Sequence, residues 1–403
     1  MRLRVQIPRV EPAAYQSWPE QCPRCGNATF HSHGFVSKPI RDTRLDQVRP
    51  RRIQCTACGH TLRVYPQGIT ARDQSERLRG LSIFLWLVGV SYRGVADVLT
   101  GLSANLQKSQ IFDNVQQLGE RVRQGQEKRL SQRRVRVLAA DCTHVRVKGQ
   151  DTVVLQLSDG ENEVTLGIEV LEGEDTASLQ VAIAEMAQAV GAGALLSDDA
   201  DPYKTVADEL GLAHQVCQQH VVPNTLVLLV EIAGQLEKRR EGATGAEAAK
   251  IAQALADLGE MEELILWRCP GSQGQWETLA RRYEREALPK KGQRATPYAR
   301  LKLLTMDLAA DWPRLTLTER QRDAQGRRFI PPTNNVSEQQ IGLNIKERYR
   351  PMRGYKSETS LRRVVALTAY LRDERDDQAL FAERSRHANM DVLVHQQTLL
   401  RPG

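Results

Sequence analysis

Four of the seven cysteines of this sequence form two Cys-x-x-Cys pairs, Cys22/Cys25 and Cys55/Cys58. Each pair lies beside a segment typical of a β-strand, and two such pairs can present four thiolates in the tetrahedral geometry of structural Zn²⁺. An odd number of cysteines that includes two such pairs favours metal binding over a disulfide framework. We therefore predict one zinc site, the alternative being four reduced, buried cysteines. Three histidines could each replace one thiolate: His31, His33 and His60.

The 29 residues between the two cysteine pairs exceed the common zinc-ribbon spacing, so this module needs an additional loop or hairpin.

Carboxylates that follow predicted strands form the second chemical pattern. Asp141 directly follows one apolar segment, and Asp198 and Asp199 follow a second, Ala194–Ser197. Carboxylates at the ends of neighbouring strands can converge on one point, and such hard oxygen ligands are those that Mg²⁺ binds. Taken singly, each aspartate is better explained as a turn residue or as a helix N-cap, the latter for Asp199 or Asp201. Two such aspartates, one after each of two predicted strands, favour a metal site as the competing interpretation.

Glu338 is the third candidate acid and lies at the start of a predicted helix. Its local alternative is specific, because Asn335 as N-cap with Glu338 at the third helical position would form a capping box. Local sequence alone favours that cap. The combination with Asp141 and Asp198 favours a metal ligand instead.

The elements that must position these residues begin with a β-rich stretch of 70 residues, followed by helices. The predicted strands are 47–54 and 61–65, and the predicted helices are 75–90, 91–99 and 105–122. Ser91 is suited to cap the second helix. This short helix, a turn with Gly101 and a longer helix outline a helix-turn-helix; a plain helical linker or a dimerisation bundle is the alternative.

Strands and helices alternate in the middle of the chain. The predicted strands are 135–140, 152–158, 163–170, 194–197 and 214–217, and the predicted helices are 175–190 and 201–210. This order predicts a mixed α/β fold with a partly parallel sheet. Further helices are predicted at 221–240, 244–263, 336–347 and 361–372.

Composition indicates a globular protein with a polyanionic partner. Of the 403 residues, 41% are hydrophobic and 26% are charged, and 56 Lys+Arg against 49 Asp+Glu give a net charge of +7. That excess favours nucleic acid as a partner. The most apolar stretch, Leu81–Val90, is only ten residues long, so no membrane span is predicted. The N-terminus lacks the apolar core of a signal peptide, and we expect a cytoplasmic protein.

Together these motifs resemble the DDE transposases of bacterial insertion sequences. The resemblance rests on Asp141 after a first strand, Ser197-Asp198-Asp199 after a later strand, and Asn334-Asn-x-x-Glu338 on a late helix. It extends to a Cys217-x-x-His220 motif, to the helical stretch 224–328, to the basic stretch 350–357 and to the second cysteine pair within 51–59. It covers nearly the whole chain.

The resemblance implies an RNase H-like catalytic core in which Asp141, Asp198 and Glu338 bind Mg²⁺ or Mn²⁺. The strand register favours Asp198 over Asp199 as the second acid. Two metal ions about 3.5–4 Å apart can stabilise the attacking and leaving oxygens of a phosphodiester transfer. Water as the nucleophile would nick a transposon end, and the freed 3′-hydroxyl would then join that end to target DNA.

The resemblance also implies that Cys217-x-x-His220 organises the active site rather than binding zinc, together with Asn334 and Asn335. A chance pair of residues in a strand-to-helix turn is the alternative. Side chains expected to contact DNA are Arg51, Arg52, Lys108, Asn114, Arg353 and Lys356, and the alternative for them is a solvated surface.

Six segments are expected along the chain. They are a zinc-ribbon DNA-binding module (1–70), a helix-turn-helix region (71–130), the first part of the catalytic core (131–230), a helical insertion (231–328), the second part of the core with Glu338 (329–375) and a C-terminal tail (376–403). The expected partners are the terminal inverted repeats of a transposon and target DNA, bound by a homodimer or higher oligomer at the bacterial nucleoid, with no membrane partner. The rival hypotheses are a non-catalytic, domesticated DNA-binding protein and a nuclease of the same fold.

Overall fold

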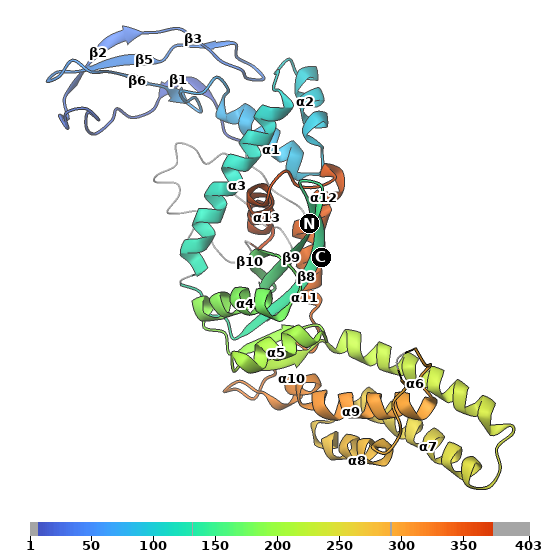
Figure 1. Ribbon diagram of the computed structural model, residues 1–403. Coiled ribbons are helices and arrows are strands. Elements are labelled where there is room, and N and C mark those ends of the chain that lie inside the picture. Colours follow the sequence, from blue (N-terminus) through green and yellow to red (C-terminus); the bar gives the residue numbers. More distant parts are fainter. Residues whose placement is uncertain (1–6, 131, 291, 374–403) are drawn as a thin grey trace, which may run out of the picture. The chain divides into compact units, whose positions relative to one another are not determined.

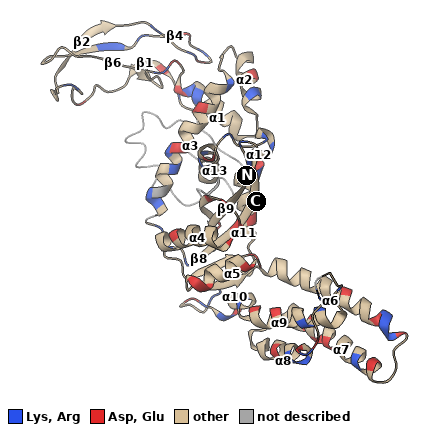
Figure 2. Ribbon diagram, viewed as in Figure 1, with Lys and Arg blue, Asp and Glu red and all other residues tan. Residues whose placement is uncertain are grey.

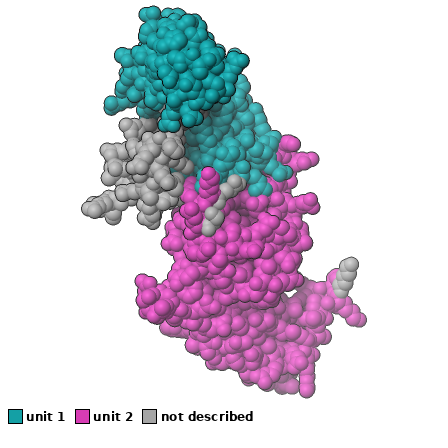
Figure 3. Space-filling view, turned by 90° about the vertical axis from the view of Figure 1, so that its left-hand side faces the viewer, with its two compact units in different colours: residues 1–125, 344–403 teal, residues 126–343 magenta. Residues whose placement is uncertain are grey.

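The computed structural model describes residues 7–130, 132–290 and 292–373 (Figure 1). The chain divides into two compact units, one of residues 1–125 and 344–403 (unit 1) and one of residues 126–343 (unit 2) (Figure 3). The expected C-terminal tail (376–403) and the charged N-terminus (Met1–Val5) lie outside the described residues. None of the described helices combines the length and the apolar character that crossing a membrane requires.

Unit 1 begins with small antiparallel sheets. The strands are β1 (Glu11–Tyr15), β2 (Phe30–Phe35), β3 (Lys38–Pro39), β4 (Gln47–Val48), β5 (Arg51–Cys55), β6 (Thr61–Val64) and β7 (Pro66–Gln67). They form a sheet of order β2-β5-β6 and the pairs β1-β7 and β3-β4. The β3-β4 hairpin lies between the cysteine pairs and confirms the additional hairpin. The single strand predicted over 47–54 is divided at Pro50, which has no N–H to donate to a sheet.

The helices of unit 1 come from both ends of the chain. They are α1 (Glu76–Leu87), α2 (Tyr92–Gly101), α3 (Lys108–Leu130), α12 (Glu347–Met352) and α13 (Glu358–Asp373). Ser91 caps α2, as predicted, by accepting a hydrogen bond from the Gly94 N–H at 3.1 Å. Helix α3 contacts α13 closely, since a Cβ atom at Gly119 would collide with the Arg363 carbonyl, and Arg363 Nε lies 2.9 Å from Glu120 Oε2. Helix α13 is therefore part of this unit.

The sheet of unit 2 confirms the predicted mixed α/β fold. Its strands are β8 (Val137–Val147), β9 (Gln150–Asp159), β10 (Val164–Leu171), β11 (Ala194–Ser197) and β12 (Ala213–Val216). Their order is β10-β9-β8-β11-β12. The β8-β9-β10 part is antiparallel, whereas β11 is parallel to both β8 and β12.

Helices cover this sheet according to the alternation of its side chains. Leu138 and Ala140 of β8 pack with α4 (Thr176–Val190) and α5 (Asp201–Glu209) in one apolar cluster. Val137 and Ala139 face the other side, against Leu317 of α10 (Leu317–Arg320) and Ile330. Since successive residues of β8 belong to different clusters, the sheet is buried on both faces, which explains why its central strands read as continuous apolar segments.

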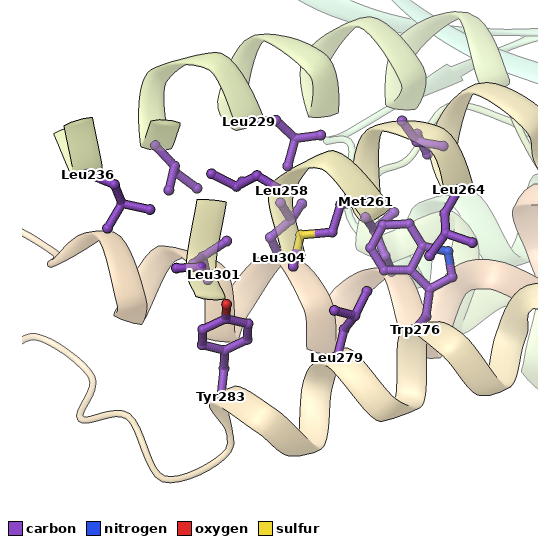
Figure 4. Close-up of a cluster of buried hydrophobic side chains, with 14 of the residues drawn as sticks. Leu229, Leu236, Leu258, Met261, Leu264, Trp276, Leu279, Tyr283, Leu301 and Leu304 are labelled. Atoms are coloured by element: carbon purple, nitrogen blue, oxygen red, sulfur yellow. The ribbon is translucent and has the colours of Figure 1, made fainter. Parts of the chain in front are cut away.

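The helical part of unit 2 follows β12. It consists mainly of α6 (Gln218–Arg240), α7 (Gly245–Trp267), α8 (Gln273–Tyr283) and α9 (Pro297–Leu315). These helices bury a shared core around Met261, Trp276 and Trp312, part of which Figure 4 shows. The two tryptophan rings lie 5.4 Å apart between centroids. The chain then returns to the sheet with α11 (Asn335–Gln340), followed by a π-helical turn, Ile341–Lys346.

Candidate active site

Asp141 and Asp198 lie at the same level of two neighbouring parallel strands. The β8-β11 pairing ends where Leu196 faces Ala139. Asp198 and Asp141 are each two residues further along their own chain segment. The expectation that Asp141 ends its strand is wrong, because β8 continues to Val147 by pairing with β9. What ends near Asp141 is the parallel pairing with β11, which leaves one side of this carboxylate free of a strand.

Asp141 lies close enough to Asp198 and Glu338 for their negative charges to affect its pKa. The pKa of Asp141 is raised from 3.8 to about 7, first by burial and then by the negative charges of Asp198 and Glu338. Like charges that share a site disfavour the ionised form, and a bound divalent cation would reverse that effect. The donor set consists of hard carboxylate oxygens, which fits Mg²⁺ or Mn²⁺.

Asn334 connects the start of α11 to the sheet. Its Nδ2 donates a hydrogen bond to the Ala140 carbonyl oxygen at 2.9 Å, and its backbone N–H donates to Cys217 Sγ at 3.2 Å. Asn334 is only 1% exposed. Ala140 directly precedes Asp141, and Glu338 lies one helical turn beyond Asn334. These two hydrogen bonds therefore hold Glu338 near the aspartates.

Glu338 does not belong to a capping box. Asn334 rather than Asn335 is the N-cap residue of α11, and no side chain makes a capping hydrogen bond there. The local interpretation of Glu338 as a cap is therefore wrong. Its Oε1 atom instead lies 3.4 Å from His220 Nε2. Asn335, expected beside the site, is exposed, and its side chain makes no hydrogen bond within the described ranges.

Cys217 and His220 lie at the start of α6, beside Glu338. Cys217 is fully buried, and its backbone N–H donates to the Ser197 carbonyl oxygen at 2.8 Å, so the end of β12 is tied to the end of β11. Burial raises the pKa of its thiol. The side chain of His220 remains 45% exposed.

Asp199 is in a different environment from Asp198. Asp199 Oδ1 lies 2.8 Å from Lys204 Nζ, which also contacts Asp311 at 2.6 Å. Asp199 also lines a pocket of about 170 Å³ with residues of α6 and α9. Helix α5 has Ala200 as its N-cap residue and no capping side chain, so the cap suggested for Asp199 or Asp201 is wrong.

Asp198 itself makes a turn contact, accepting a hydrogen bond from the Ala200 N–H at 3.2 Å.

Glu174 is an acid near the site that sequence reasoning missed. It lies between β10 and α4, and its pKa is raised by burial and by the charge of Asp198. The sequence feature that could have indicated Glu174 is the acidic segment Glu172–Asp175, which directly follows a predicted strand.

The four paired cysteines come together in unit 1. Their sulfur atoms all lie within 4.8 Å of one another, with 3.7 Å between Cys22 and Cys58 and 3.6 Å between Cys25 and Cys55. A tetrahedral Zn²⁺ with bonds of about 2.3 Å would separate its sulfur ligands by about 3.8 Å, so the donor set fits zinc. The Cys58 backbone N–H contributes most to lowering the pKa of Cys55 to about 6, which favours the thiolate that metal binding needs.

The residues expected at DNA lie in unit 1, where Figure 2 shows Lys and Arg on β5, α2 and α3. The Arg51 guanidinium lies over the Tyr15 ring at 5.0 Å and the Phe35 ring at 5.6 Å. Arg52, also on β5, faces Arg63 across the sheet. Lys108, Arg353 and Lys356 are exposed.

Asn114 is the exception among these residues. It is 1% exposed and exchanges two hydrogen bonds with Gln74, at 3.0 and 3.1 Å. The expectation that it contacts DNA is wrong, because this face of α3 is used to hold the β-rich module and the helices of unit 1 together.

No protein-family model and no curated protein matches the sequence. Among solved structures, the HTLV-2 integrase catalytic core domain in complex with magnesium (trimeric form) matches with 13% identity and a TM-score of 0.19, over 30% of this chain and 84% of that one. The catalytic core domain of BIV integrase matches with 10% identity and a TM-score of 0.18, over 51% of this chain and 95% of that one. TM-scores of this size do not establish a common fold.

Proposed function

We propose that this chain is a DNA transposase of the DDE type, with an RNase H-like core that cleaves transposon ends and joins them to target DNA. The observation that carries the proposal is that Asp141 of β8 lies level with Asp198 at the end of β11, and that the charges of Asp198 and of Glu338 on α11 both raise the pKa of Asp141. Residues so far apart in sequence form one acidic group only through the fold. The β-β-β-α-β-α-β order of unit 2 is the order predicted from the sequence pattern, and it is compatible with the core that the resemblance implies.

In this proposal Asp141, Asp198 and Glu338 hold two divalent metal ions, with Asn334 and Cys217 fixing the position of Glu338. When bound, such ions activate the attacking oxygen and stabilise the leaving oxygen of the phosphodiester. The chain's own contribution is positioning. The hydrogen bonds donated by the Asn334 side chain, the Asn334 N–H and the Cys217 N–H set the carboxylates in place. Burial of Asp141 reduces competition from water.

DNA binding is assigned to unit 1, to residues 1–70 with the helices of 71–130, and also to Arg353 and Lys356. Arg52 and Arg63 face each other across β5 and β6, and like charges in that position destabilise a sheet. A polyanion would remove this repulsion. The aromatic rings beside Arg51 hold its guanidinium in a fixed orientation, which suits phosphate or base contacts.

The test is Mg²⁺-dependent cleavage of labelled DNA that carries the ends of the element encoding this chain. Glu338→Gln should lower cleavage by orders of magnitude while DNA binding is retained, because a neutral amide holds a divalent cation poorly. Asp199→Asn is the matched control and should cleave nearly as well as the parent protein.

Cleavage by Glu338→Gln at the parent rate would refute the proposal. Binding without cleavage by the parent protein would favour the non-catalytic alternative. A parent protein that cleaves but does not join pre-cleaved ends to target DNA would instead be a nuclease.

A further inference from the structure

Three donor atoms of different chemistry lie together beside the acidic group. The Cys217 sulfur, a ring nitrogen of His220 and a carboxylate oxygen of Glu338 all lie within 4.8 Å of one another. Cys217 and His220 come from the start of α6, whereas Glu338 comes from α11. The cluster therefore shares Glu338 with the proposed Asp141 and Asp198 site.

The chemistry of this set differs from that of the acidic group. A thiolate, an imidazole and a carboxylate are ligands that Zn²⁺ accepts, and sites with three protein ligands keep a fourth position open. At the usual Zn–N and Zn–O distances of about 2.0–2.2 Å, a tetrahedral ion would separate the nitrogen and oxygen by about 3.4 Å. His220 Nε2 and Glu338 Oε1 are 3.4 Å apart. Mg²⁺, in contrast, selects oxygen ligands and does not account for a sulfur donor.

Two further features prepare these atoms to bind a metal. Glu338 Oε1 is a buried acceptor that receives no hydrogen bond within the described ranges of the chain. Cys217 Sγ receives the Asn334 N–H at 3.2 Å, an outer contact of the kind that orients metal ligands. The His220 side chain, 45% exposed, leaves a route for an ion to enter.

We propose that Cys217, His220 and Glu338 form a second zinc site, separate from the four-cysteine cluster. Zn²⁺ bound there takes Glu338 away from Asp141 and Asp198, and it therefore inhibits the Mg²⁺-dependent reaction. The binding is inferred from this geometry alone, whereas the inhibition rests on the proposed function. This assignment goes beyond the organising role that the sequence resemblance implies for the Cys-x-x-His motif.

The first experiment measures binding by the full chain, with the four-cysteine cluster already loaded with zinc. Zn²⁺ is titrated in competition with a chromophoric chelator. The parent protein should bind one further equivalent, which Cys217→Ser and His220→Gln should lose. Cys142→Ser and His144→Gln are matched controls, because they change the same residue types on β8, and both should keep the second equivalent.

His220→Gln alters a half-exposed side chain and leaves the Cys217–Asn334 hydrogen bond intact, so a lost equivalent in this variant is not a folding defect. Thermal melting of each variant checks this point. Co²⁺ in place of Zn²⁺ gives a second readout, since the thiolate-to-metal absorption of the second equivalent should vanish in Cys217→Ser and persist in Cys142→Ser. The proposal is overturned if the parent protein binds no second equivalent of zinc. It is also overturned if both Cys217→Ser and His220→Gln still bind that equivalent.

The second experiment adds Zn²⁺ to the Mg²⁺-dependent cleavage assay, with each variant compared to its own rate without Zn²⁺. Half-inhibition of His220→Gln should require at least about tenfold more Zn²⁺ than half-inhibition of the parent protein, since loss of even an outer partner of a metal ligand costs about 10–100-fold in metal affinity. Equal sensitivity of the two proteins overturns the inhibitory role. If the parent protein binds the second equivalent but cleaves no DNA, the proposed function fails while the zinc site stands.

Discussion

The four-cysteine cluster of unit 1 and the acidic group of unit 2 are assembled in opposite ways. The two cysteines of each pair are separated by only two residues in a tight turn, so only one long interval, from Cys25 to Cys55, must be closed. The acidic group draws on β8, β11 and α11, with almost 200 residues between its first and last members. The first site depends on local spacing, whereas the second depends on strand pairing and on two hydrogen bonds of Asn334. Substitutions should therefore affect the two sites very differently.

Removal of a cysteine ligand should have the largest effect. Cys55→Ser should lose one equivalent of tightly held zinc, and the β-rich module should unfold, because structural Zn²⁺ contributes about 10–16 kcal/mol of apparent folding free energy in small zinc modules. Elemental analysis and hydrogen exchange over residues 7–70 measure this. Cys269→Ser, at an exposed cysteine, is the control. A zinc-free but folded module would contradict the assignment.

Removal of a site acid should stabilise the protein while abolishing its activity. The pKa of Asp141 is raised from 3.8 to about 7, so the folded protein holds this proton more tightly than the unfolded chain does. The contribution of this carboxyl to stability is therefore fully present below about pH 4 and is lost as the pH rises through about 7. In Mg²⁺-free buffer at pH 8, Asp141→Asn should increase the free energy of unfolding by up to about 4 kcal/mol.

Urea denaturation of both proteins at pH 8 and pH 4 measures this difference, which should shrink at the lower pH. Mg²⁺ should stabilise the parent protein more than Asp141→Asn. A variant that is less stable than the parent protein at pH 8 would show that Asp141 is held by favourable contacts instead of crowded by other acids.

Substitution of Asn334, which connects α11 to the sheet, should have an intermediate effect on stability and on cleavage. Asn334→Ala removes the hydrogen bond to the Ala140 carbonyl and should cost about 1–3 kcal/mol of stability, since a buried acceptor loses its donor. Cleavage should also fall, because Glu338 loses its anchor. Asn335→Ala, at the exposed neighbouring position, is the matched control. Equal activity of the two variants would mean that Asn334 does not position Glu338.

The smallest effect is expected at the acid next to the site. Asp199→Asn should change the free energy of unfolding by no more than about 1 kcal/mol, because its ion pair with Lys204 is partly exposed and Asp311 still contacts that lysine. Its cleavage rate should stay close to that of the parent protein. A loss of activity as large as that of Asp198→Asn would exchange the roles of the two aspartates. Cleavage assays and urea denaturation of Asp198→Asn and Asp199→Asn, run side by side, measure this difference.

The sequence predicted the local features of both regions well. The strand Ala194–Ser197 has the predicted bounds, Ser91 caps its helix, and the cysteine pairs meet. The failures all have a tertiary origin. β8 runs past Asp141 because β9 is longer than β11, and a strand that ends beside one neighbour continues beside the other. No pattern within one segment contains that information.

The same holds for Asn114 and for the start of α11. The pattern of α3 shows an apolar stripe but not the polar partner, Gln74, that buries Asn114 beside it. Local sequence alone favours a capping box at Asn335, because the spacing to Glu338 is correct. The N-cap residue of α11 is instead Asn334, one residue earlier, and its side chain donates a hydrogen bond to the Ala140 carbonyl, 194 residues away in the sequence. Contacts of that range depend on the complete fold.

Unit 1 is discontinuous, and this has a consequence for synthesis of the protein on the ribosome. Helix α13, whose Arg363 carbonyl contacts Gly119 of α3, is made only after all of unit 2. At roughly 5–20 residues per second, the N-terminal helices wait on the order of 10–50 s for this partner. Unit 2 is complete before then. A nascent chain can therefore finish its acidic site before its proposed DNA-binding unit, and a message truncated near its 3′ end would yield the former without a complete version of the latter.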